Sequence, residues 1–498
     1  MLFLNFSIIF VPEMKHIIYT YCILFLCILS LYAQPKHEIR AVWLTTNYGL
    51  DWPSRPVRSI ADVEVQKAEL NVILDKIQAS KMNVVFFQSR LRGDVTYPSA
   101  IEPWSRFIKK SYDEYSGYDP LKFAIEACHK RGLECHAWLV VYPMGKTELI
   151  NRNANGKDNR LTKQLDGETY LDPGNPDTNG YLLAIIDEIV RNYDVDGIHF
   201  DYIRYPDKAD AFPDFNSYSE YGKSKNVQDW RRENINKFVY LAYDKIKALK
   251  PWVQVSSSVV GVYEKIESNK PYRTAFSEVY QDPIDWIIKG KHDFIVPMMY
   301  YPDDLFYASI NNWTERSNGR WIVPGLGVYQ LDESQKNWNA DVILNQIDLC
   351  RRKNVAGMAY FRAQYLIENK KEILSKIESR FYQYPAVLPP LTWLDRTIPQ
   401  APKEPVAKWQ RNAILLSWEK PQGEEKDLYY NVYYSQSESV DISDPKNLLA
   451  TRLKDTNLLV GAKQGQAYYY VVTASNRFRN ESVASKSVYF RAGGLAAK

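Results

Sequence analysis

The sequence predicts a (β/α)8 barrel followed by a smaller β-sandwich. Strand-like and helix-like segments alternate eight times between Glu38 and Tyr384, which is the pattern of a closed parallel barrel. The chain then changes to short alternating strands separated by polar turns, as in a sandwich. A doubly wound open sheet is the alternative, but the chain lacks the glycine-rich first turn that such a fold often carries.

Each predicted strand is a short run of mostly apolar residues, and most are followed by an amphipathic helical segment. The predicted strands are Ile39–Thr45, Asn83–Ser89, Glu134–Tyr142, Val195–Tyr202, Trp252–Val259, Asp293–Tyr300, Trp321–Val328 and Ala356–Arg362. The clearest helices are Val65–Ser80, Pro120–Arg131, Asn179–Tyr193, Asp229–Leu249 and Ala340–Lys353. Two long insertions, 142–179 and 207–229, follow strand ends, where barrel enzymes build their sites, and are predicted to cover a cleft.

The amino-terminal segment 1–33 is predicted to be a signal peptide whose translation starts at Met14. Lys15 and His16 give a basic start, residues 17–31 are apolar, and Ala33 fits a small-residue cleavage position. We therefore expect export to the periplasm or the cell exterior. No stable membrane span is expected once the signal is removed, because the apolar run is short.

The carboxyl-terminal part begins after a proline-rich linker. The barrel is predicted to occupy residues 37–384, the linker 385–405 and the sandwich 406–498. Trp418 in an early strand and the run 468–474 resemble a fibronectin type III domain. A spacer or packing role is favoured for it over sugar binding.

Composition limits the classes of partner. A formal net charge of +4 on 498 residues gives no reason to expect nucleic acid. Aromatic residues make up 14%, which suits a carbohydrate cleft but is explained as well by a large core. We expect a monomer that needs no cofactor and binds a polysaccharide or oligosaccharide.

The segment 195–206 is the part of the chain that most clearly indicates chemistry. His199 and Asp201 lie on one face of a strand that would be apolar on both faces if it were purely structural. Glycoside cleavage usually needs two carboxyl groups, so Asp201 is the first catalytic candidate. Asp196 lies near the strand start, where position predicts a role in stability.

The second carboxyl group is open between several residues. Asp172 in a Pro-Gly turn could lie over the cleft or only cap its turn. Asp304, with Asp303 beside it, could face the site or be exposed, and Glu264 is a weaker candidate. We take Asp201, Asp172 and Asp304 as the catalytic set.

Substrate-binding candidates gather at the other strand ends. They are Trp43, Gln88, Arg90, Trp138, His199, Tyr202, Arg204, Tyr300, Tyr360 and Arg362. Arginines here, with Arg92 nearby, could orient an acidic sugar substituent or form rim salt bridges, and His199 could be a satisfied core histidine. No metal is predicted, because His136 and His199 have no HExxH context.

Several motifs in order resemble the bacterial glycosyl-hydrolase-like family ten. They are Glu38-Ile-Arg-Ala-Val-Trp-Leu-Thr-Thr46, Trp52-Pro53, Phe87-Gln-Ser-Arg90, Leu171-Asp-Pro-Gly-Asn-Pro176, Asp196-Gly-Ile-His-Phe-Asp-Tyr-Ile-Arg-Tyr-Pro206 and Asp229-Trp-Arg-Arg232. The resemblance implies an exported barrel glycoside hydrolase acting on cell-wall glycan, notably strands stripped of peptides.

Carried over by position, the family's pattern falls on Gln88, Arg90, Asp172, His199 and Asp201. Many relatives have a second Asp directly after the strand, where this chain has Tyr202, so a role that relies on that second Asp has no counterpart here. Relatives also carry an aromatic-Arg-Asn pattern at the position of this chain's 262–264 segment.

Three functions follow as hypotheses from these residues. The first is a glycoside hydrolase, the second a non-catalytic glycan-binding barrel, and the third a metal-dependent, deacetylase-like enzyme. They differ in whether new reducing ends appear and whether a chelator abolishes activity.

Overall fold

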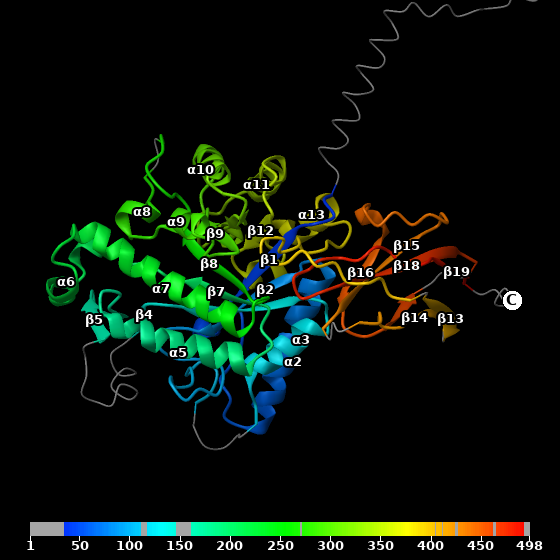
Figure 1. The fold of residues 1–498 in the computed structure, drawn as a ribbon, viewed down its shortest axis with the longest axis horizontal. Helices are drawn as coiled ribbons and strands as arrows, with labels where there is room; N and C mark the ends of the chain where they lie inside the picture. Colours follow the sequence, from blue (N-terminus) through cyan, green and yellow to red (C-terminus); the bar gives the residue numbers. More distant parts are fainter. Residues whose placement is uncertain are drawn as a thin grey trace, which may run out of the picture. The chain divides into compact units, whose positions relative to one another are not determined.

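The computed structural model describes residues 34–110, 117–145, 161–268, 271–403, 405–410, 412–423, 427–461 and 465–492, so the predicted signal peptide lies outside the described residues. Within them, eight strand positions form a closed parallel barrel (Figure 1). In chain order these are β1 (Ile39–Leu44), β2 (Val84–Arg90), β3 (Glu134–Val140), β7 (Gly197–Asp201), β8 (Gln254–Val260), β9 (Phe294–Met298), β10 and β11 (Trp321–Ile322 and Gly325–Leu326) and β12 (Gly357–Tyr360). The seventh position is split in two at Pro324, which has no N–H to donate. The barrel prediction is confirmed.

The helices that cover the barrel begin where the sequence supplies caps. Asp119 and Asn175 accept backbone N–H groups at the starts of α3 and α5, and each is followed by a proline, which favours the first helical position. The long helices are α2 (Ile60–Ala79), α3 (Pro120–His129), α5 (Pro176–Asn192), α7 (Val227–Leu249), α10 (Asp303–Glu315) and α11 (Ala340–Arg352). Shorter helices are α8 (Ala275–Glu278), α9 (Pro283–Ile288), α12 (Ala363–Ile367) and α13 (Ile373–Arg380). Across the described ranges, none of the helices combines the length and apolarity needed to cross a bilayer.

Strand alternation divides the core into an inner and an outer layer. Residues that face the barrel axis, such as Trp43, Phe86 and Ala359, form a compact inner cluster. Their sequence neighbours face the helices and join the large outer cluster. The inner cluster fills the barrel below the strand ends, so groups at those ends rest on packed side chains.

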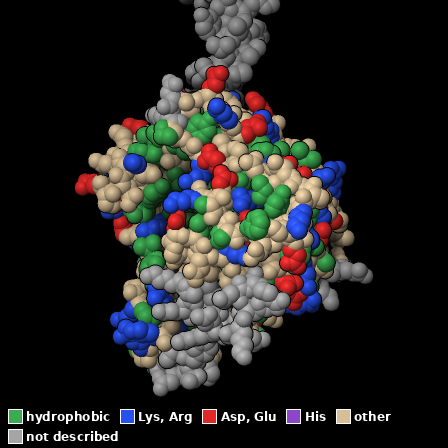
Figure 2. Space-filling model, turned by 90° about the vertical axis from the view of Figure 1, so that its left-hand side faces the viewer, with side chains coloured by type: hydrophobic (Ala, Val, Ile, Leu, Met, Phe, Trp, Pro, Cys, Tyr) green, Lys and Arg blue, Asp and Glu red, His purple; other side chains and the backbone are tan. Residues whose placement is uncertain are grey.

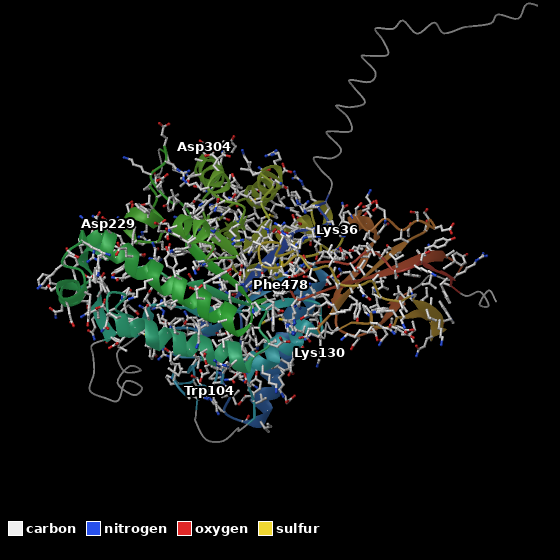
Figure 3. The ribbon with its side chains drawn as sticks, viewed as in Figure 1. Lys36, Trp104, Lys130, Asp229, Asp304 and Phe478 are labelled. Atoms are coloured by element: carbon white, nitrogen blue, oxygen red, sulfur yellow. The ribbon has the colours of Figure 1, made fainter. Side chains whose placement is uncertain are left out.

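The described parts of the two insertions lie at the carboxyl-terminal end of the barrel. The first contains a small antiparallel sheet of β4 (Pro143–Gly145), β5 (Thr162–Leu165) and β6 (Glu168–Leu171). The second contains α6 (Phe215–Tyr221). In Figure 3, Asp229 near the start of α7 marks this end, and Lys130, just after α3, lies near the opposite end.

The carboxyl-terminal part forms two antiparallel sheets. One has three strands, β13 (Val406–Gln410), β14 (Ala413–Ser417) and β17 (Asn457–Gly461). The other has β15 (Tyr429–Ser435), β16 (Leu448–Leu453), β18 (Ala467–Ser475) and β19 (Val488–Arg491). Side chains of both sheets, including Leu416, Trp418 and Val472, form one shared core. The fibronectin type III assignment stays a prediction.

These sheets close the amino-terminal end of the barrel with a buried layer of charge. Arg479 donates to both oxygens of Glu134 at the start of β3. Arg452 donates to Asp196, which precedes β7 and also contacts His129 at 2.7 Å. Burial acts to raise the pKa of Asp196, yet Arg452 and His129 hold that pKa well below its usual value. Asp196 thus lies in a buried ion-pair layer at the strand start, and its role in stability stays a prediction.

The proline-rich linker is part of the same junction. Leu388 packs with the inner barrel cluster, and Leu391 is buried. The backbone of Val387 exchanges hydrogen bonds with Lys36 and Glu38. Barrel, linker and sheets therefore belong to one compact unit, residues 36–498.

Candidate active site

A cavity of about 320 Å³ opens at the carboxyl ends of the barrel strands, where barrel enzymes assemble their sites. Its lining residues are Thr45, Asn47, Leu50, Gln88, Leu91, Arg92, Trp138, Val140, Pro143, Asp201, Tyr202, Met298, Tyr300, Phe361 and Arg362. Figure 2 views this end of the molecule and shows acidic and basic side chains interleaved across its middle. Six of the predicted site residues thus come together around one cavity.

A larger groove of about 690 Å³ lies on the outside of the barrel, beside α5 and α7. Several of its polar side chains already satisfy one another, such as Tyr240 with Asp285 and Lys225 with Glu233. The groove carries no strand-end residue, so the cavity at the strand ends is the better candidate.

Asp201 is held in a fixed orientation at the end of β7. Its Oδ2 accepts a hydrogen bond from the Trp138 indole nitrogen at 3.1 Å, and its Oδ1 accepts from the Tyr202 backbone nitrogen at 2.8 Å. Tyr202 has a φ of 50°, which is rare for a bulky residue and marks a locally strained turn. This turn ends the strand and places the Tyr202 ring in the cavity wall.

Burial raises the pKa of Asp201 to about 6, against the opposing effects of the Tyr202 N–H, Arg204 and Trp138. Only 6% of the residue is exposed, and desolvation disfavours the charged carboxylate. A carboxyl group with such a pKa can deliver a proton near neutral pH, which suits a general acid.

Tyr300, just after β9, forms an aromatic part of the wall. Its ring stacks on Phe361 with centroids 5.6 Å apart. Its hydroxyl is buried and, among the side chains of the lining residues that the structure describes, is the one buried polar atom without a hydrogen-bond partner. Burial and the nearby Asp201 raise the pKa of Tyr300 well above its usual value, so the hydroxyl stays protonated and can donate to a ligand.

Gln88 organises the loop after β1. Its Oε1 accepts from the Thr45 hydroxyl at 2.6 Å and from the backbone nitrogens of Thr46 and Asn47, each at 3.0 Å. Three donors on one oxygen fix the amide orientation, so the amide nitrogen is the group of Gln88 that can donate to a ligand.

His199 and Trp43 lie beneath the cavity, in the inner core. The Trp43 Nε1 lies 3.0 Å from His199 Nε2; because an indole only donates, Nε2 accepts and Nδ1 carries the proton toward the Ser256 hydroxyl at 2.8 Å. Burial, with smaller effects from His136 and His292, keeps the pKa of His199 well below its usual value. His199 is thus a satisfied core histidine, one of the two alternatives that the sequence left open.

Arg90 does not face the cavity, contrary to expectation. The pairing of β2 with β3 shifts register between Gln88, opposite Trp138, and Arg90, opposite Leu139. This bulge turns Arg90 toward the outer side of the sheet, where it forms a buried, bidentate ion pair with Glu102 at 2.8 and 2.6 Å.

The substrate-binding candidates at the end of β12 lie on two sides of the sheet, one facing the cavity and the other facing the helices. Tyr360 faces outward, and its hydroxyl lies 2.6 Å from that of Tyr382. It therefore does not reach the cavity, although the sequence predicted it as a substrate-binding residue. Phe361, the next residue, faces inward and lines the cavity. Arg362 lines it too, but its guanidinium is paired with Asp51.

Arg204 lies beside the cavity rather than in its lining. Its guanidinium is 4.9 Å from the Tyr202 ring centroid and 2.7 Å from Asp207. It therefore supports the Tyr202 turn and acts on Asp201 only through its charge.

The two predicted partner carboxylates do not reach Asp201. Asp172 is buried outside the cavity lining, accepting from the Gly174 nitrogen at 2.9 Å and from the Ser217 hydroxyl; it caps its own turn and ties it to α6. Asp304 is exposed at the outer rim on α10 (Figure 3). The side chain of Asp303 lies outside the described residues, and Glu264 pairs with Arg316.

Three residues that anchor or line the site, Asp51, Glu102 and Phe361, were not among those expected from the sequence. Asp51 accepts from Thr45 at 2.8 Å and pairs with Arg362, and Glu102 neutralises Arg90. Phe361 could have been found, because the alternation from Ala359 puts it on the inner face. Asp51 and Glu102 lie in irregular loops, where no periodicity shows what they face.

A metal-binding arrangement is not found in the described ranges: no three His, Cys, Asp or Glu side chains there are grouped to hold an ion. His136 and His199 make hydrogen bonds within the barrel instead. The third hypothesis, a metal-dependent enzyme, therefore receives no support from side-chain placement.

Comparison with known proteins agrees with this geometry. The family model described as "Glycosyl hydrolase-like 10" matches residues 38–329. The chain is 32% identical to "Glycosyl hydrolase YngK" of Bacillus subtilis, covering 91% of this chain and 94% of that protein. It is 28% identical to "Glycosyl hydrolase DigH" of Escherichia coli K12, covering 70% and 88%.

A solved structure supports the fold. The glycoside hydrolase domain of PgaB (BpsB) from Bordetella bronchiseptica superposes with a TM-score of 0.51 at 15% identity, covering 69% of this chain and 99% of that one. The chain belongs to the glycosyl hydrolase-like 10 family and folds as the (β/α)8 barrel expected for it.

Proposed function

We propose that the protein is an exported glycoside hydrolase that cleaves a bacterial glycan, with peptide-free peptidoglycan strands as its substrate. Family membership and the relatives named as glycosyl hydrolases support the reaction class. The signal-like segment 1–33 supports export to the periplasm or cell exterior. A monomer suffices, since one chain builds the cavity.

Asp201 carries the proposal. It is the one carboxyl group among the described residues that line the cavity, and burial keeps its pKa near 6. We assign it the acid's role, in which it protonates the leaving glycosidic oxygen, because a nucleophile would need a lower pKa. Trp138 and the Tyr202 backbone aim the carboxyl group, and Tyr300 and Phe361 offer aromatic surface to a sugar ring.

The test is the release of new reducing ends from peptide-free glycan strands, followed by mass spectrometry of the products. Replacing Asp201 by Asn (Asp201→Asn) removes the transferable proton and should lower the rate by a factor of about 10² or more. Asp304→Asn is the matched control, because this exposed carboxylate lies away from the cavity, and it should cleave like the wild type.

Two outcomes would contradict the proposal. Full activity of Asp201→Asn would remove Asp201 from the mechanism. Retention of the glycan by the wild type without new reducing ends would support the alternative, a non-catalytic glycan-binding barrel.

A further inference from the structure

Four arginines surround the candidate active site, and three of them are buried and paired within the protein. Arg90 lies against Glu102, Arg362 against Asp51, and Arg204 against Asp207, which also pairs with Arg273. These three guanidinium groups are less available to a ligand, because each is buried and already meets a carboxylate. Arg92 differs from these three in exposure and in the strength of its pairing.

Arg92 lines the cavity, and 41% of its side chain is exposed. Its Nη1 lies 3.0 Å from Glu168 Oε2, whose side chain is 36% exposed. An ion pair between two side chains this exposed contributes little to the stability of the protein. An incoming anion can therefore replace Glu168 at small cost.

The base of Arg92 is rigid although its guanidinium is accessible. The Arg92 nitrogen donates to Asp94 at 3.1 Å. Gly145 of β4 packs so closely that a Cβ there would lie 3.3 Å from the Arg92 Cβ. A Cβ on Gly93, whose φ is 77°, would lie 2.8 Å from the Met144 Cε. The backbone is thus fixed, which lowers the entropy lost when the side chain binds a ligand.

Arg92 also lies near the reacting group. It shares the cavity lining with Asp201 and Tyr202, and its charge acts on the Tyr202 hydroxyl. An anion bound at Arg92 would be part of the sugar unit next to the bond that Asp201 protonates.

We propose that Arg92 is a specificity residue that binds a carboxylate on the substrate, so that the preferred glycan carries an acidic sugar beside the cleaved bond. This inference rests on the proposed hydrolase function. It predicts that masking the carboxylate, for instance as an amide, weakens recognition even when the rest of the sugar is unchanged.

The test compares two matched substrates, an amino-sugar oligosaccharide with free lactyl-ether carboxylates and the same oligosaccharide with these groups converted to methylamides. The wild type should cleave the acid with a kcat/KM about 10- to 100-fold higher. Arg92→Gln should bring this ratio close to one, because glutamine cannot form the charged pair. Glu168→Gln should increase the ratio severalfold, because it frees Arg92.

Arg273→Gln serves as the control, because Arg273 is an exposed arginine that pairs with Asp207 outside the cavity lining; its ratio should match the wild type. An oligosaccharide of N-acetylhexosamine and hexuronic acid tests whether the carboxylate must be a lactyl ether or can be a uronate. Equal cleavage of acid and methylamide by the wild type, or an unchanged ratio in Arg92→Gln, would overturn the inference. Failure to cleave any of these substrates would instead count against the proposed function.

Discussion

The two ends of the barrel differ in the partners of their buried polar groups. At the amino-terminal end, Glu134 and Asp196 are buried and fully paired with Arg479 and Arg452 of the carboxyl-terminal sheets. At the carboxyl-terminal end, Asp201 is buried without a cation in contact, and the Tyr300 hydroxyl has no described partner. Satisfied charge stabilises a fold, whereas groups left available can act on a ligand.

The carboxyl-terminal sheets are more than a spacer, because they pair with buried groups of the barrel. Their arginines meet acidic groups that begin the barrel strands, and Gly132 lies so close to Thr451 that a Cβ would fall 2.6 Å from its carbonyl oxygen. Each part leaves buried charges uncompensated if the other is removed. This favours the packing role predicted for the carboxyl-terminal part.

The largest expected effect on stability is at the amino-terminal end of the barrel, which the carboxyl-terminal sheets cover. Arg452→Met keeps the aliphatic stem but leaves Asp196 buried without its cation, so it should lower the free energy of unfolding by about 3–5 kcal/mol. Denaturant titration measures this. Lys454→Met is the control, because its 3.2 Å pair with Asp194 is half exposed and should contribute only about 0–1 kcal/mol. Equal effects of the two variants would contradict the idea that the buried ion pair contributes more to stability than an exposed pair at the same end.

At the carboxyl-terminal end of the barrel, the pH dependence of stability should reveal the raised pKa of Asp201. Its folded-state pKa of about 6 lies above the ordinary 3.8, so the protonated group favours the folded state at low pH. That contribution is lost as pH rises from about 4 to about 6. Relative to the wild type, Asp201→Asn should therefore become more stable across this window, by up to about 3 kcal/mol at about 1.4 kcal/mol per pKa unit.

The same titration should appear in catalysis. An acid with this pKa loses its proton above about pH 6, so the wild-type rate should fall on the alkaline side of that value. Denaturation curves of both proteins at several pH values, with rates of the wild type alongside, test the two statements together. A stability difference that does not change with pH would mean that Asp201 is ionised throughout.

The smallest effects come from two tyrosines whose side chains face opposite sides of the barrel wall. Tyr360→Phe removes a buried hydrogen bond to the Tyr382 hydroxyl and should lower the free energy of unfolding by about 1 kcal/mol. The rate of glycan cleavage should change little. Tyr300→Phe removes an unpartnered hydroxyl, so stability should hold while kcat/KM falls about tenfold. If Tyr300→Phe lost stability and kept its rate, Tyr300 would be structural.

Much of the fold could be predicted from local patterns. The eight strands, five of the six long helices and the position of Asp201 at a strand end follow from apolar periodicity and from caps such as Asn175, whereas α10 was not predicted. The site was harder to predict. Gln88 and Arg90 look equivalent by alternation, yet a bulge between them sends one into the cavity and the other to Glu102.

The sequence by itself determined a parallel barrel with an acidic group at the end of its fourth strand, because periodicity is written within short windows of the chain. Only the tertiary structure decided which polar groups are paired. The partners of Arg90, Arg362 and Asp196 lie in loops or in the carboxyl-terminal sheets, 12, 311 and 256 residues away. Such pairings depend on barrel closure and strand register, which bring distant segments together and leave Asp201, Tyr300 and Arg92 available to a ligand.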